Sequence, residues 1–228
     1  MTRPPLRDGA AARQRDDARP PRGPGLSRAG VLQAIPDAAL AAAFALAWAR
    51  PDIAAPWLVR DLVLVMLYEF IVVHSTGFMG AAWFAATGRR GRVLMVLGLG
   101  LLYTLFVGGF AAAFGTWWPL LAFWGLTLNR ALPMLLRQAR PGEEGALVLR
   151  TWVAGVIFYL GFTALTVVAD VPPLGLTPDV AAAVDLPGGG LWIDEPHRAL
   201  AFGSLYFAAT ALSGAFAHAW VPVRAGDV

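Results

Sequence analysis

The stretch Leu62–Ala86 reads LVLVMLYEFIVVHSTGFMGAAWFAA and decides the fold class of this chain. A transmembrane helix needs about 20 consecutive apolar residues, so a run of this length predicts a helix that crosses a bilayer. Two ionisable residues, Glu69 and His74, interrupt the run. A charge inside a membrane is costly and usually has a partner in the protein interior. Glu69 is therefore the strongest single indication of a functional site in the sequence.

The composition of the whole chain agrees with a membrane protein. The 228 residues are 57% hydrophobic and 14% charged, and the mean hydropathy is +0.59. Soluble proteins have about 25% charged residues. A soluble domain would have to bury several apolar runs of about 20 residues each. The chain has no cysteine, which excludes disulfides, thiolate metal sites and cysteine nucleophiles.

Six apolar segments predict an all-α, polytopic bundle of about six transmembrane helices. The first is the weakest because Gln33, Pro36 and Asp37 lie in its first half. A helix that began only at Pro36 would have about 14 residues, too few to cross a bilayer. The six segments form one predicted transmembrane domain, 29–223, and have the approximate bounds 29–49, 62–84, 93–113, 117–136, 146–168 and 199–221.

The residues before this domain, 1–28, are rich in Pro, Gly, Arg and Asp and poor in aromatic side chains. Such a segment buries too little apolar surface to offset the entropy lost on ordering, so we expect a disordered tail. The tail carries a net charge of +4, from seven Arg and three acidic residues.

The arginines also predict the orientation in the membrane. Every second connection is rich in Arg, as in TGRRGR at 87–92, whereas the connection at 115–118 is uncharged. Arg-rich loops remain in the cytoplasm. We therefore expect a multi-pass protein of a bacterial cytoplasmic membrane, with the N-terminus and the C-terminus both in the cytoplasm.

The connection at about 170–198 is the largest predicted outer segment and is rich in acids. Thr177 followed by Pro178 predicts the start of a short helix. Asp194 is expected to cap the sixth transmembrane helix. Capping and solvation account for these acids, and a weak cation site of Asp194, Glu195 and His197 is the alternative.

Glu69 and His74 are five residues apart, which places them about 140° apart around a helix. This angle argues against a compact pair, so a partner for Glu69 is sought on another helix. Arg130 lies in the fourth segment between Asn129 and Pro133, and a proline leaves the carbonyl four residues earlier without its helical donor. Glu69, His74, Asn129 and Arg130 are the candidate residues of a polar site, with a Glu69–Arg130 ion pair as the hypothesis. A snorkelling Arg130 is the alternative.

His74 and His218 fall in the same half of the predicted bundle, and imidazoles from two helices can bind haem or a metal. They are weak candidates, because simpler roles explain both: His218 as an interfacial residue beside Trp220, and His74 as a hydrogen-bonded contact between helices. We predict no cofactor and no metal.

No motif identifies a reaction: HExxH, GxSxG and P-loop patterns are absent, and the catalytic residues are unknown. Arginines are not interleaved with aromatic residues outside the apolar segments, so nucleic-acid binding is not expected. Three functions remain open. The first is a membrane protein with a buried polar site for a small ligand or a proton relay. The second is a scaffold or assembly subunit with a membrane-protein partner, and the third is a haem- or metal-binding membrane enzyme. The lipid bilayer is the one partner that all three share.

Overall fold

The computed structural model describes residues 26, 28–84, 89–136 and 141–223, with the backbone alone at 28, 29, 81–84, 89, 92, 129–136, 141–145 and 147. The predicted tail at 1–28 lies almost entirely outside these residues and stays a prediction. The helices are α2 (Arg28–Ala49), α3 (Pro56–Phe84), α4 (Arg89–Phe114), α5 (Trp118–Leu136), α6 (Pro141–Val168), α7 (Pro178–Val184), α8 (Leu191–Asp194) and α9 (Pro196–Ala215).

The predicted all-α membrane bundle is confirmed. The described residues contain no strand, and the six long helices α2, α3, α4, α5, α6 and α9 correspond to the six apolar segments. Helix α2 continues through Pro36 and has 22 residues, which is about 33 Å of helix at 1.5 Å per residue. The weak first segment therefore forms a helix of membrane-spanning length.

Four of these helices are long and apolar enough to cross a membrane by length and composition: Gly30–Ala49, Pro56–Gly80, Val93–Phe114 and Val148–Val168. In α5 the search for such a stretch covers Trp118–Leu128, because the side chains of the rest of the helix are not described. Helix α9 has many small residues and much of it is buried inside the protein. A helix that packs mainly against protein does not need the continuous apolar surface that lipid contact requires.

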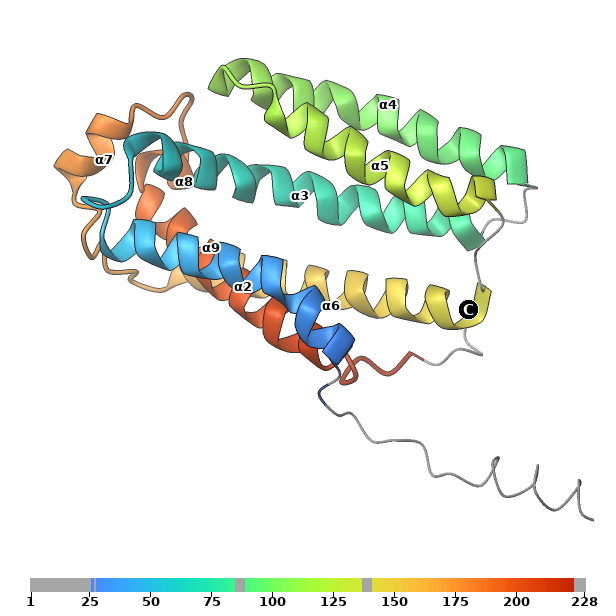
Figure 1. Ribbon diagram of the computed structural model, residues 1–228. Coiled ribbons are helices and arrows are strands. Elements are labelled where there is room, and N and C mark those ends of the chain that lie inside the picture. The colour runs from blue at the N-terminus through green and yellow to red at the C-terminus, as the bar shows by residue number, and fades with distance from the viewer. Residues whose placement is uncertain (1–25, 27, 85–88, 137–140, 224–228) are drawn as a thin grey trace, which may run out of the picture.

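The connections between the long helices lie at two ends of the bundle (Figure 1). The turn before α3, the turn between α4 and α5, and the segment with α7 and α8 lie at one end. The beginnings of α2, α4 and α6 lie at the other end, where Arg89 and Arg90 open α4. The arginines at the beginning of α4 thus lie at the opposite end from the acidic segment, as an alternating six-helix topology requires.

Helix α3 is the centre of the bundle. Half of its membrane-spanning stretch is buried, compared with 17–22% in the other three such helices. Its Met66 and Val73 belong to a core shared with α2, α6 and α9, whereas Tyr68 and Ile71 belong to a second core shared with α4 and α5. The residues of α3 near Glu69 therefore pack against two different groups of helices.

Helices α2 and α9 pack very closely (Figure 1). The reason is Gly203, where an added Cβ would lie 2.3 Å from the ring of Phe44. Phe44 in turn stacks on Phe207 at a centroid distance of 5.5 Å. Small residues at a membrane-helix interface permit such an approach, because dispersion contacts rather than hydrophobic burial hold the helices together.

The outer segment between α6 and α9 folds into α7 and α8. Thr177 is the N-cap residue of α7, as its sequence predicts, although its side chain makes no capping hydrogen bond. The prediction for Asp194 was wrong, because Asp194 is the last residue of α8 and the N-cap of α9 is Glu195. The Asp194 carboxylate instead accepts a hydrogen bond from the backbone N–H of Gly190 at 3.1 Å.

Candidate functional site

Glu69 has a hydrogen-bond donor on a distant part of the chain. The hydroxyl of Tyr206 on α9 donates to Oε1 of Glu69 on α3 at 2.6 Å. Tyr206 is only 2% exposed, and Glu69 is half-buried. Hydrogen bonds to a carboxylate are shorter and stronger than those between neutral groups. Such a bond in the middle of an apolar bundle makes this pair the centre of the candidate site.

Tyr159 on α6 forms one wall of this site. Its hydroxyl donates to the backbone carbonyl of Met66 at 3.2 Å, and its ring meets the ring of Tyr206 edge-on at 5.8 Å. Phe202 packs edge-on against Tyr159 at 4.9 Å. The edge-to-face geometry is the arrangement that aromatic rings prefer. Three helices, α3, α6 and α9, thus fix the position of the Tyr206 hydroxyl.

A second carboxyl group approaches from α2. Asp37 lies within electrostatic range of Tyr206 and is half-buried. The close packing of α2 and α9 brings it there. The phenol of Tyr206 therefore has acidic neighbours on two helices, Asp37 on α2 and Glu69 on α3.

His74 lies apart from this site on the same helix. Its Nδ1 donates to the backbone carbonyl of Phe70 at 2.8 Å. The centroid of its ring lies 4.0 Å from the centroid of the Phe70 ring. The imidazole is exposed and lines a groove between α3 and α6. The side chains of Glu69 and His74 thus lie in different surroundings, which agrees with their angular separation on the helix.

Asn129 and Arg130 lie in α5, where the structure describes the backbone alone. The Glu69–Arg130 ion pair is therefore still a prediction. The bond from Tyr206 is compatible with it, since a carboxylate has two oxygens and can accept several hydrogen bonds.

His218 has a local structural role. It is buried in the turns that follow α9, and its Nδ1 lies 2.7 Å from Oγ of Ser213. The indole N–H of Trp220 donates to the same oxygen at 2.6 Å. Among the described residues, no group of three or more His, Cys, Asp or Glu side chains could hold a metal ion. A metal site of His74 and His218 thus has no further ligand of these types in that part of the chain.

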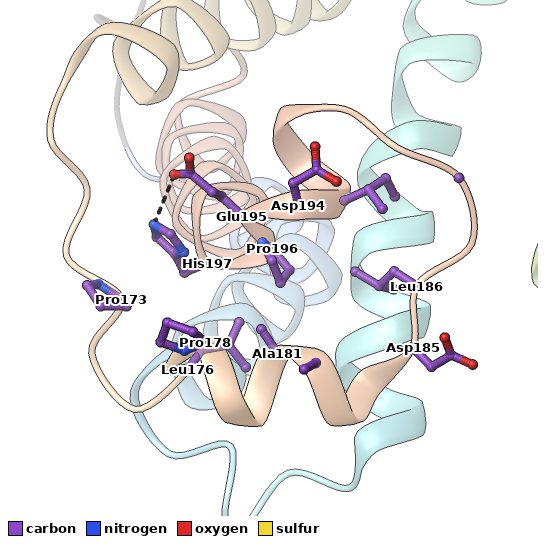
Figure 2. Close-up of a pocket in the computed structure, with 13 residues that line it drawn as sticks. Pro173, Leu176, Pro178, Ala181, Asp185, Leu186, Asp194, Glu195, Pro196 and His197 are labelled. Carbon is purple, nitrogen blue, oxygen red and sulfur yellow. Dashed lines mark ion pairs between the residues drawn. The ribbon is translucent and has the colours of Figure 1, made fainter.

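The outer segment encloses a cavity of about 440 Å³ beside α7, α8 and the beginning of α9 (Figure 2). Leu176, Ala181 and Leu186 contribute apolar walls, and Asp185 and His197 are among its polar groups. Figure 2 shows the Asp185 carboxylate on the opposite side of the cavity from His197. The Asp194 carboxylate accepts its hydrogen bond from Gly190. In the described part of the chain, no three His, Cys, Asp or Glu side chains form a group that could hold a metal ion, which argues against the cation site of Asp194, Glu195 and His197.

An ion-pair cluster fixes one edge of this cavity. Arg198 donates to Glu195 at 2.5 Å and to the carbonyls of Thr166 and Ala169 at the end of α6, at 2.7 and 2.8 Å. The hydrogen bond from Arg198 lowers the pKa of Glu195. Loss of solvation lowers the pKa of His197, although Glu195, 3.7 Å away, opposes the shift. Through Arg198 the cluster joins the end of α6 to the beginning of α9.

Sequence reasoning missed Tyr159 and Tyr206 as site residues. Asp37 could have been predicted as a site residue, since an acid inside an apolar segment is costly. The sequence interpretation used Asp37 only as an argument against the first transmembrane helix. The tyrosines gave no such signal, because single tyrosines are common in apolar segments and nothing local marks the partner of each hydroxyl.

Comparison with known proteins gives no relative of this chain: no family model, no curated protein and no solved structure matches it.

Proposed function

We propose that this membrane protein exchanges protons at a site within the bilayer, centred on Glu69 and Tyr206. The observation that supports the proposal is the 2.6 Å hydrogen bond from the Tyr206 hydroxyl to Glu69, between two central helices of the bundle. Ionisable residues inside membranes commonly mark proton relays and ion pathways. A short bond from a phenol to a carboxyl group supplies both a proton donor and a proton acceptor at one point.

The second acid gives the site a way to redistribute protons. Asp37 and Glu69 both contribute to the electrostatic surroundings of Tyr206, so its hydroxyl has two carboxyl groups toward which it can turn. The Tyr206 hydroxyl can donate one hydrogen bond at a time and can accept others. When Glu69 takes up a proton, the hydroxyl of Tyr206 is released to turn toward the Asp37 side. We assign Glu69 as the group that binds the proton and Tyr206 as the group that reorients.

The test uses purified protein reconstituted in lipid vesicles. Acid-minus-alkaline infrared difference spectra of the wild type should contain the band of a buried carboxylic acid. Glu69→Gln should remove that band and reduce voltage-driven proton uptake to the level of protein-free vesicles. Asp179→Asn, which removes an exposed carboxylate of the outer segment, should change neither signal. Identical spectra and proton uptake in the wild type and in Glu69→Gln would reject the proposal.

A second proposal is that the protein is an assembly subunit that binds a membrane-protein partner through its outer segment. The cavity of about 440 Å³ beside α7 supports it, because a recess lined by both apolar and polar groups suits the side chain of a partner. Purification after mild solubilisation separates the two functions. A stoichiometric partner that is retained by the Glu69→Gln variant favours the assembly role.

A further inference from the structure

A groove of about 400 Å³ runs between α3 and α6 and shares Tyr159, but neither Glu69 nor Tyr206, with the site of Glu69. It lies along two of the stretches that are apolar and long enough to cross a membrane, Pro56–Gly80 and Val148–Val168. Its walls include three residues of each helix: His74, Gly77, Phe78, Trp152, Val156 and Tyr159.

The walls are held in place by contacts between the helices. Gly77 allows the indole of Trp152 to lie against α3, since an added Cβ would be 2.7 Å from its Nε1. The Trp152 N–H donates to the backbone carbonyl of Val73 at 3.0 Å, and the Tyr159 hydroxyl donates to Met66. The donors of both aromatic residues are therefore occupied, and their rings present largely apolar surface to the groove.

His74 and Tyr159 are the titratable side chains among the residues that line the groove, and the Tyr159 hydroxyl already donates to Met66. A carbonyl oxygen only accepts hydrogen bonds, so the 2.8 Å contact with Phe70 requires a proton on Nδ1. In the neutral imidazole the other nitrogen, Nε2, is then an acceptor. An acceptor in apolar surroundings is costly unless a donor reaches it. A ligand that suits this groove therefore has a hydroxyl or N–H group that donates a hydrogen bond to Nε2 of His74.

We propose that this groove binds an amphipathic quinol or phenol, a flat hydroxylated ring whose hydroxyl donates to Nε2 of His74. The ring is flanked by Trp152, Tyr159 and Phe78, since aromatic faces stack on one another or meet edge-on. An apolar tail on the ring extends along the groove into the bilayer. The inference stands independently of the proton-exchange proposal, because it uses neither Glu69 nor Tyr206.

The test compares ligands that differ only in the hydrogen-bond donor. Protein in nanodiscs of synthetic phosphatidylcholine is titrated under reducing conditions with a decyl benzoquinol, and separately with its dimethyl ether. The quinol should bind saturably and about fivefold more tightly than the ether. This ratio corresponds to the net binding free energy that one hydrogen bond contributes. His74→Phe should abolish this preference and leave the affinity for the ether unchanged.

A second pair of variants tests the location. Val156→Phe adds volume to the groove wall and should weaken both ligands. Val167→Phe adds the same bulk to α6 at an exposed position outside the groove and should weaken neither. Equal affinities for quinol and ether in the wild type, or a preference that persists in His74→Phe, would overturn the proposal. Unsaturable uptake equal to that of empty nanodiscs would also overturn it, since the groove would then hold only lipid chains.

Discussion

At the scale of single residues, the Tyr206 hydroxyl is the group on which the candidate site depends. It is buried with its oxygen 2.6 Å from Glu69. Removing one partner of a buried hydrogen bond leaves the other without compensation for its lost solvation. A conservative change at this position therefore reports directly on the site.

Tyr206→Phe should lower the free energy of unfolding by about 1–3 kcal/mol, because the Glu69 carboxyl group loses a donor. Glu69→Gln should cost less, since the amide oxygen still accepts the bond. Unfolding in mixed detergent micelles measures both. Tyr103→Phe on α4 is the matched control and should change stability by less than about 0.5 kcal/mol. A Tyr206→Phe effect no larger than that of the control would contradict the assigned bond.

At the scale of the elements, the contact of α2 with α9 brings Asp37 into electrostatic range of Tyr206. Gly203 faces the ring of Phe44 so closely that an alanine methyl group must displace the ring. Gly161 on α6 has nothing within 4 Å of its added Cβ. The two glycines therefore differ in packing, although both lie within long helices.

Gly203→Ala should destabilise the protein by about 1–3 kcal/mol, through overpacking against Phe44. Gly161→Ala should have the opposite sign and stabilise by up to about 1 kcal/mol, because alanine favours the helix. Thermal unfolding of the two variants in the same detergent checks the signs. Shortening the opposing side chain, with Phe44→Leu, should reduce the cost of Gly203→Ala. Equal effects of the two glycine substitutions would show that α2 and α9 are not this close.

At the scale of the whole molecule, the two ends of the bundle carry different charges. The acidic segment with α7 lies at one end, and the arginines that open α4 lie at the other (Figure 1). We propose that the arginine end faces the cytoplasm of a bacterial cell, as the charge rule for membrane proteins requires. Both termini then lie in the cytoplasm.

The absence of cysteine makes this orientation simple to test. Arg90→Cys and Asp179→Cys each introduce one thiol at an exposed residue, at opposite ends of the bundle. In intact cells a membrane-impermeant maleimide should label Asp179→Cys and not Arg90→Cys. Both variants should react once the membrane is permeabilised. The reverse pattern in intact cells would invert the proposed orientation.

The sequence alone determined the fold class, the number of long helices and the unusual status of Glu69. Length and apolar composition suffice for these, because a bilayer imposes a minimum helix length and a high cost on buried charge. Only the tertiary structure decided that Tyr206 bonds to Glu69, that Asp37 lies within electrostatic range of Tyr206 and that His74 faces a separate groove. The surfaces of these helices are apolar where they face lipid and where they face protein: Leu105, for example, is 73% exposed and Leu64 is fully buried. With lipid as apolar as the core, no amphipathic face indicates which helices pack together.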